Sequence, residues 1–194
     1  MFKRFFTIIM IMLLFHGVAF AVENAQSPCL ATAQSLSLTG NENFYKVSEN
    51  LYRGRQPDEN GFKALENMGI KTVINLRTSD SDKEYIENTN LGYERISFNP
   101  FMPDKDEVIA FLKIATDPEK TPVFVHCHHG SDRTGVMVAA YRIIICGWSK
   151  ERAIKEMVDG PFGFHGIFFN LKNFVKELDV EKIRKKAGLE KKGE

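Results

Sequence analysis

The sequence predicts an α/β protein with a central, mainly parallel sheet flanked by helices, and three observations support this fold class. Short apolar runs with β-branched residues, at 71–77 and 123–127, indicate buried strands. Segments that predict helices, at 58–69 and 104–116, alternate with these runs. The 194 residues are 43% hydrophobic and 26% charged, which is typical of an ordinary globular domain. Strands that alternate with helices form mainly parallel sheets covered on both faces.

Residues 1–21 differ from the rest and predict a secretory signal peptide. A basic start precedes an apolar stretch at 5–15, and Ala19-Phe20-Ala21 matches a small-x-small cleavage site. The apolar stretch is shorter than the ~20 residues that a membrane-spanning helix needs. We therefore expect cleavage after Ala21, export to a bacterial periplasm, and no stable membrane insertion. An uncleaved membrane anchor is the alternative.

The two ends of the mature chain are predicted to lie outside the folded domain, which we place at 41–180. Residues 22–40 are rich in Ala, Ser, Gln and Thr and predict a flexible linker. The locally basic residues 181–194 predict a solvated helix end, with contact to a membrane surface as the alternative. Cleavage of the signal leaves 24 basic against 25 acidic residues, a net charge of −1, so nothing indicates a nucleic-acid partner.

The chain has three cysteines, Cys29, Cys127 and Cys146. An odd count in an exported protein leaves at least one free thiol. Cys29 and Cys146 are candidates for a disulfide, but Cys146 ends an apolar helical segment and is expected to be a core residue. We therefore expect no disulfide.

The first half of the domain predicts paired strands, a helix and two further strands. Residues 44–55 alternate in polarity like two short strands. Asp58 is a suitable N-cap for the helix that follows, and Gly69 ends it. A strand at 71–77, a polar segment with a short helix at 78–90, a strand at 91–98 and a loop at 99–103 come next.

The second half of the domain is dominated by helices. The helix predicted at 104–116 has an apolar inner face made of Val108, Ile109, Phe111, Leu112 and Ala115. An apolar helix at 135–146 is closed by Gly147, and Ser149 caps the next one. A loop at 159–166 precedes an amphipathic closing helix at 167–178.

The segment from Cys127 to Gly135 carries the chemistry. It joins the end of the strand at 123–127 to the start of an apolar helix, and backbone N–H groups at such a junction form a cradle for an anion. Arg133 adds a guanidinium fork for two phosphate oxygens. Cys127 lies at the floor of this cradle, where a helix N-terminus and a nearby cation stabilise a thiolate. Such a thiolate can attack phosphorus and form a phosphocysteine.

The other residues of the loop have predicted supporting roles. Gly130 suits a turn with positive φ, and the Thr134 hydroxyl is placed to hydrogen-bond the sulfur. The residues expected to bind the substrate are His128, His129, Gly130, Ser131, Asp132 and Arg133. We expect no metal and no cofactor, because the consecutive His and Cys residues begin on a strand, where neighbours point to opposite faces.

The segment from His126 to Gly135 resembles the His-Cys-x-x-Gly-x-x-Arg-Ser/Thr-Gly signature of cysteine-dependent protein tyrosine and dual-specificity phosphatases. Residues 51–57, Leu-Tyr-Arg-Gly-Arg-Gln-Pro, resemble the Tyr/Trp-Arg-x-x-Gln-Pro stretch of atypical bacterial, plant and fungal members. The resemblance implies a phosphate-binding loop at the carboxyl end of a central strand and a phosphomonoester hydrolase that uses a phosphocysteine intermediate. A sulfur-transfer loop and a non-catalytic phospho-ligand binding module are the alternatives.

The general acid is left open by the sequence. In this superfamily it is an aspartate on a separate loop upstream of the cysteine. Asp106 is preferred, because atypical bacterial and plant members carry an acid at about this distance from the cysteine, and Asp104 is the alternative. One of the two is expected to cap the helix that follows. Asp132, Asp80 and Asp82 are less favoured candidates.

The small size of the chain and the residues of its phosphate-binding loop favour a phosphorylated protein over an inositol phosphate as the substrate. No long insertion is present to build a deep, tyrosine-only pocket, which favours dual specificity. Relatives that act on inositol pyrophosphates carry lysines in the phosphate-binding loop, whereas this loop has His128, His129, Ser131 and Asp132, and the added carboxylate suits a polyanion poorly. A small phosphoester stays open as the alternative substrate. Arg53 and Arg55 either border the mouth of the site or brace the sheet edge. Phe162, Phe164 and His165 either wall the pocket or pack in the core.

Overall fold

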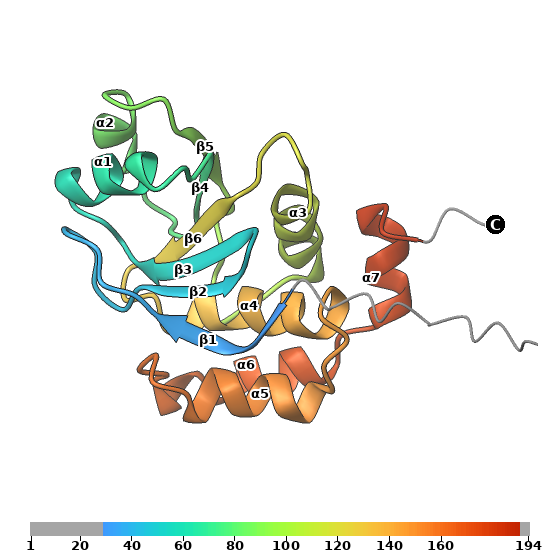
Figure 1. Cartoon of the computed structure of the whole chain (residues 1–194). Coiled ribbons are helices and arrows are strands. Elements are labelled where there is room, and N and C mark those ends of the chain that lie inside the picture. Colours follow the sequence, from blue (N-terminus) through green and yellow to red (C-terminus); the bar gives the residue numbers. More distant parts are fainter. Residues whose placement is uncertain (1–28, 191–194) are drawn as a thin grey trace, which may run out of the picture.

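A computed structural model describes residues 29–190 as one six-stranded sheet with helices on both faces (Figure 1). The strands are β1 Cys29–Ser35, β2 Tyr45–Ser48, β3 Leu51–Arg55, β4 Thr72–Asn75, β5 Gly92–Arg95 and β6 Val123–Cys127. The helices are α1 Glu59–Asn67, α2 Lys83–Ile86, α3 Lys105–Ala115, α4 Asp132–Ile144, α5 Lys150–Asp159, α6 Phe169–Lys176 and α7 Val180–Ala187, with a short 3₁₀ turn η1 Gly166–Phe168. The signal peptide expected at 1–21 lies outside the described residues.

The sheet has the order β1-β2-β3-β6-β4-β5, and its inner part is parallel. β6 pairs in parallel with β3 and β4, and β4 pairs in parallel with β5. Among the six strands, antiparallel pairing is confined to one edge, where β2 pairs with β1 and β3. All five residues of β6 are buried, as expected for a central strand covered on both faces. The predicted mainly parallel sheet is confirmed.

Two apolar layers cover the sheet and set the direction of each side chain in β6. On one face, Phe124 belongs to a core with Phe62 and Leu65 of α1. On the other face, Val125 and Cys127 belong to a larger core that includes residues of α3 to α7. Successive side chains in a strand point to opposite faces. Cys127 therefore lies on the face that carries α4, the helix that follows it in the chain.

Capping residues expected at the starts of α1 and α3 are confirmed, whereas α4 begins at Asp132, three residues before its predicted start. The Asp58 side chain caps α1 by accepting a hydrogen bond from the Gly61 N–H at 2.8 Å, and Gly69 beyond its end has φ of 83°. Asp104 caps α3 in a reciprocal arrangement with Glu107. The whole predicted inner face of α3 is buried: Val108, Ile109, Phe111, Leu112 and Ala115.

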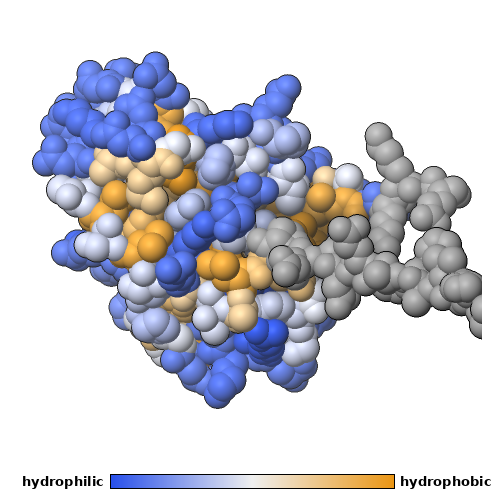
Figure 2. All heavy atoms as spheres, viewed as in Figure 1, coloured by the Kyte–Doolittle hydropathy of each residue, from blue (hydrophilic) through white to orange (hydrophobic). Residues whose placement is uncertain are grey.

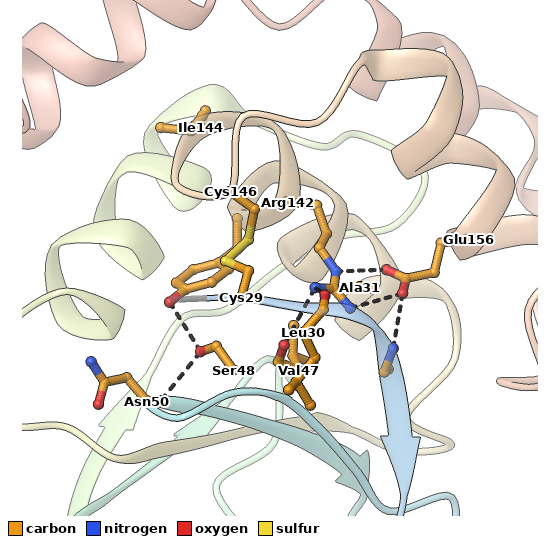
Figure 3. The surroundings of a disulfide bond; sticks show 12 residues. Cys29, Leu30, Ala31, Val47, Ser48, Asn50, Arg142, Ile144, Cys146 and Glu156 are labelled. Atoms are coloured by element: carbon orange, nitrogen blue, oxygen red, sulfur yellow. Dashed lines mark hydrogen bonds and ion pairs between the residues drawn. A yellow bond between two sulfur atoms is a disulfide. The ribbon is translucent and has the colours of Figure 1, made fainter. Parts of the chain in front are cut away.

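The linker expected at 22–40 is wrong over 29–35, because these residues form the edge strand β1. Its first residue, Cys29, forms a disulfide with Cys146 just beyond α4, with 5.7 Å between the Cα atoms (Figure 3). The expectation of unpaired cysteines is therefore also wrong. The pairing was missed because a strand, not a linker, carries Cys29 to the end of α4.

A buried arginine completes the attachment of β1. Arg142 of α4 donates two hydrogen bonds of 2.9 Å to the Glu156 carboxylate of α5 and a third, of 2.6 Å, to the Leu30 carbonyl (Figure 3). The Val47 carbonyl of β2 accepts another at 3.3 Å. The Ala33 N–H of β1 donates to the Glu156 carboxylate at 3.2 Å. Four elements, β1, β2, α4 and α5, therefore meet around one guanidinium.

The chain beyond 180 belongs to the fold, contrary to the expected solvated end. Ile183 and Ala187 of α7 are buried in the core that includes α3 and α4. Arg184 donates a hydrogen bond of 2.6 Å to the Ile144 carbonyl at the end of α4. The predicted domain boundary at 180 is thus too short by one helix, while residues 191–194 lie outside the described part of the chain.

The face of the molecule shown in Figure 2 carries mostly hydrophilic side chains. Figure 2 shows them over α1 and α2 and along the lower helices, with apolar residues in smaller patches between. No helix within residues 29–190 is long and apolar enough to cross a membrane.

Candidate active site

The loop between β6 and α4 forms the floor of a pocket of about 450 Å³. Cys127, the last residue of β6, lines this pocket together with Arg133 in the first turn of α4. The remaining lining residues are Arg77, Thr78, Ser79, Pro100, His128, His129, Asp132, His165, Ile167 and Phe168. The structure thus brings five of the predicted site residues to one pocket: Cys127, His128, His129, Asp132 and Arg133.

The loop conformation depends on close contact between two glycines. Gly130 has φ of 74°, the left-handed region predicted for it. A Cβ atom at position 130 would overlap the carbonyl group of Gly54 and lie 2.6 Å from the Arg55 nitrogen. The backbone N–H groups of residues 128–131 donate no hydrogen bond to an acceptor within residues 29–190. They are left available for an anion, as the predicted cradle requires.

Arg53 supports this loop from below. Its side chain is buried, donates a hydrogen bond of 2.6 Å to the Gly130 carbonyl, and lies 3.8 Å from the centroid of the Phe162 ring. Burial lowers the pKa of Arg53 to about 10, so it stays protonated at neutral pH. Arg53 therefore braces the loop, and Arg55 forms an ion pair with Glu42 at the surface.

His126 points to the opposite face of the sheet from Cys127. Its Nε2 lies 3.1 Å from Oδ2 of Asp82, and both side chains are fully buried, although their alignment falls short of a hydrogen bond. Gln56 donates to the other oxygen of Asp82 at 2.6 Å. The glutamine of the Gln-Pro stretch is thus connected to the histidine beside the cysteine. Asp82 does not line the pocket, so its position does not support a role as the general acid.

Two predicted roles in the loop are not seen. Ser131 donates its hydroxyl proton to the Phe162 carbonyl at 2.7 Å, so it anchors the 160–165 loop and does not line the pocket. The Thr134 hydroxyl is fully buried and has no hydrogen-bond partner among the described residues. The expected bond from Thr134 to the Cys127 sulfur is therefore absent in this structure.

Asp132 holds His165. One carboxylate oxygen of Asp132 accepts a hydrogen bond from the His165 N–H at 2.8 Å, and the other lies 2.8 Å from Nδ1 of its imidazole. Both residues line the pocket. Of the three residues considered as a pocket wall, His165 takes that place, whereas Phe162 is buried and Phe164 packs against the core.

The structure does not bring the preferred general acid to the pocket. The Asp106 side chain is 74% exposed, lies 3.3 Å from the Lys186 ammonium and lines a different groove. Asp104 is used as the cap of α3, and Asp80 accepts a hydrogen bond from the Tyr93 hydroxyl at the surface. The position of Asp106 therefore does not support its assignment as the general acid. The loop at 99–103, which precedes Asp104 and Asp106, contributes only Pro100 to the pocket.

Positive groups surround the pocket. The pKa of His128 is lowered by partial burial and by the nearby His129, Arg77, Arg55 and Arg133. Arg77 was not predicted as a site residue, although it follows β4, the parallel neighbour of β6. The carboxyl ends of parallel strands meet at one edge of a sheet, so this topology was the signal that could have found it.

Comparisons with known proteins agree with this geometry. A family model described as "DSP-PTPase phosphatase fused to NAD+ Kinase" matches residues 24–167. The dual specificity protein phosphatase TpbA of Pseudomonas aeruginosa is 31% identical over 174 residues, which cover 88% of this chain and 78% of TpbA. The chain belongs to the dual-specificity phosphatase family. It is accordingly a cysteine-dependent phosphatase, as its resemblance implied.

Two further comparisons concern proteins whose names mention a ligand or a substrate. The crystal structure of a P. aeruginosa TpbA variant in complex with pTyr has a TM-score of 0.72 and 29% identity, and the match covers 84% of this chain and 98% of that one. The inositol diphosphatase DSP3 of Arabidopsis thaliana is 25% identical over 152 residues, covering 73% of this chain and 72% of that protein.

Proposed function

We propose that this phosphatase hydrolyses phosphotyrosine and other phosphorylated side chains of proteins, with Cys127 as nucleophile and Arg133 as the cation that holds the phosphoryl group. The observation that carries the proposal is the position of the two side chains in one pocket, above a loop with free backbone N–H groups. Electrostatic stabilisation of the transferred group by such donors is usually the largest contribution to catalysis.

The reaction takes two steps at this site. The Cys127 thiolate attacks phosphorus and forms the sulfur–phosphorus bond while the bond to the leaving oxygen breaks. Water then attacks the phosphocysteine and releases inorganic phosphate and the thiolate. Thr134, whose buried hydroxyl lacks a partner among the described residues, is available to donate a hydrogen bond to the departing sulfur. His128 and His129 line the pocket proposed to bind the phosphoryl group.

An apolar rim supports a protein substrate. Pro100, Ile167 and Phe168 line the pocket, and the Phe168 ring lies 5.3 Å from that of Phe101. Four of the six exposed large hydrophobic residues in the described chain belong to the two segments that border the pocket: Phe101, Met102, Ile167 and Phe169. Exposed apolar clusters mark binding surfaces. An aromatic ring and apolar peptide residues suit this rim better than a polyanion does.

Inositol phosphates are the second candidate substrate. The sequence argument against them, a carboxylate in the phosphate-binding loop, is weakened by the structure. Asp132 was expected to repel a polyanion, but its carboxylate is bound to His165. Arg77, Arg133 and three histidines line the same pocket. A relative named as an inositol diphosphatase, at 25% identity, points the same way.

We further propose that the enzyme works outside the cytoplasm, in a bacterial periplasm. The predicted signal peptide at 1–21 supports export. The Cys29–Cys146 disulfide supports an oxidising compartment, because such bonds are rare in the cytosol.

A p-nitrophenyl phosphate assay tests the proposed activity. We expect turnover that EDTA leaves unchanged and that vanadate inhibits, and we expect Cys127→Ser to abolish it. Activity close to that of the wild type in Cys127→Ser would reject the mechanism. A panel of phosphotyrosine, phosphoserine and phosphothreonine peptides, compared with inositol phosphates, then ranks the two substrate classes by kcat/KM.

A further inference from the structure

Three donors outside the phosphate-binding loop hold three successive carbonyl groups of that loop. The backbone N–H of Gln56, the side-chain amide of Asn43 and the guanidinium of Arg53 donate to the carbonyls of residues 128, 129 and 130, at 3.4, 3.0 and 2.6 Å respectively. All three donors lie within residues 43–56, the part of the chain that contains β2 and β3. One side of the sheet therefore grips the backbone of the loop.

These contacts set the direction of the N–H groups of the loop. In a trans peptide unit the C=O and the N–H that follows it point in opposite directions, and the loop contains no cis peptide bond. Since the carbonyls of residues 128–130 point to the three donors, the N–H groups of His129, Gly130 and Ser131 point the other way. Those N–H groups have no acceptor within residues 29–190. The anion cradle is thus held from outside, through its carbonyls.

Asn43 differs from the other two donors because it combines a side-chain amide with a left-handed backbone. Its φ is 54°, and outside glycine it is the one residue of the described chain with positive φ. Its amide nitrogen also donates to the Phe162 carbonyl at 3.0 Å. Both neighbours are carbonyl oxygens, which only accept, so the nitrogen of the amide faces them. Backbone strain of this kind persists where the surrounding structure fixes it, often at functional sites.

The Phe162 carbonyl connects Asn43 to the loop a second time. The Ser131 hydroxyl donates to the same carbonyl at 2.7 Å, and the Phe162 ring lies 3.8 Å from the Arg53 guanidinium. Asn43 therefore joins three segments: the turn before β2, the phosphate-binding loop, and the 160–165 loop that carries His165 to the pocket.

We propose that Asn43 is a positioning residue of this phosphatase, which orients the peptide unit between His129 and Gly130 so that the Gly130 N–H points to the bound phosphoryl group. The inference rests on the proposed function, in which the free N–H groups of the loop stabilise that group. Without the Asn43 amide, the His129 carbonyl has no donor and can rotate toward the pocket, where its oxygen repels an anion. The carbonyls on either side stay held by Gln56 and Arg53.

Two substitutions of Asn43 separate the orientation of the loop from the stability of the fold. Asn43→Gly removes the amide and relieves the left-handed backbone, whereas Asn43→Ala removes the amide and keeps the strain. We expect both to lower kcat/KM for p-nitrophenyl phosphate about 10-fold, less than the ~100-fold loss expected for an absent donor, because the neighbouring peptide units stay fixed. Inhibition by vanadate, an anion that fills the cradle, should weaken by a similar factor. Asn43→Ala should unfold at a lower urea concentration than Asn43→Gly.

Tyr45→Phe is the matched control. The Tyr45 hydroxyl donates to the Pro161 carbonyl at 3.3 Å, so this change removes a bond between β2 and the 160–165 loop and leaves the phosphate-binding loop untouched. It should keep the wild-type kcat/KM and vanadate inhibition. Wild-type kinetics in Asn43→Gly, a loss confined to the less stable Asn43→Ala, or an equal loss in Tyr45→Phe would overturn the inference. An inactive wild type would instead reject the proposed function, which Cys127→Ser tests separately.

Discussion

At the scale of single residues, Gly130 has the tightest steric constraint in the phosphate-binding loop. Alanine there would place Cβ against the Gly54 carbonyl and would also strain a φ of 74°. We expect Gly130→Ala to displace the loop by about 1 Å and so to lower kcat at least ~100-fold. Gly69→Ala is the matched control, because Gly69 has φ of 83° but open space around its Cβ position. It should keep full activity.

The same assay, with p-nitrophenyl phosphate, compares these two glycine variants, and circular dichroism checks that both are folded. Comparable activity in Gly130→Ala and Gly69→Ala would mean that the loop tolerates a shift of its backbone. The contact with Gly54 would then not be what holds the N–H groups in place.

Arg133 is the second residue of the loop with a specific geometric requirement, because its side-chain shape as well as its charge is expected to bind the phosphoryl group. A lysine keeps the charge and loses the planar fork that binds two phosphate oxygens. We expect Arg133→Lys to lower kcat/KM for p-nitrophenyl phosphate by about 100-fold, similar to the loss of one preorganised donor. Arg152→Lys, a change of the same kind over the Trp148 ring away from the pocket, should have no effect on kcat/KM. Near-equal values for the two lysine variants would show that charge alone suffices.

At the scale of elements, the Glu156–Arg142 pair joins β1 and β2 to α4 and α5. Glu156→Gln would leave the fully buried Arg142 guanidinium without its counter-charge. We expect the free energy of unfolding to fall by about 3 kcal/mol, in line with the loss of one partner of a buried ion pair. Asp159→Asn is the control on the same helix, because its pair with Lys155 is exposed, and it should cost at most about 0.5 kcal/mol.

Urea unfolding of the two α5 variants measures this difference. Equal midpoints for Glu156→Gln and Asp159→Asn would contradict the role given to the buried pair.

The sequence predicted those elements that follow from local patterns. The strand–loop–helix around Cys127 and the caps at Asp58 and Asp104 depend on residues a few positions apart, and all three are confirmed. The other walls of the pocket are not local: Arg77 follows a different strand, and His165 comes from a loop 33 residues beyond Asp132. Only the folded sheet and the packing of the chain around it bring these side chains together, so no spacing in the sequence could place Arg77 and His165 in the pocket.

At the scale of the whole molecule, two of the three cysteines form a structural disulfide and the third is the proposed nucleophile. Cys29 and Cys146 are joined across 117 residues, while Cys127 is the only free cysteine in the described chain and is buried. A cross-link that closes so long a loop stabilises the fold by roughly 2–5 kcal/mol, mainly by restricting the unfolded chain. We therefore expect a variant carrying both Cys29→Ser and Cys146→Ser to lose about 3 kcal/mol in its free energy of unfolding and to keep its activity below its melting temperature.

Reduction of the wild type provides the decisive comparison for this bond. Dithiothreitol should lower the melting temperature of the wild type to that of the double serine variant, by roughly 6–12 °C for a domain of this size, and should leave the double variant unchanged. Since the same reagent keeps Cys127 reduced, the wild type should lose stability while its activity toward p-nitrophenyl phosphate is maintained or rises. An equal response of the two proteins to dithiothreitol would mean that Cys29 and Cys146 are not bonded, and β1 would then depend on Arg142 and its sheet pairing alone.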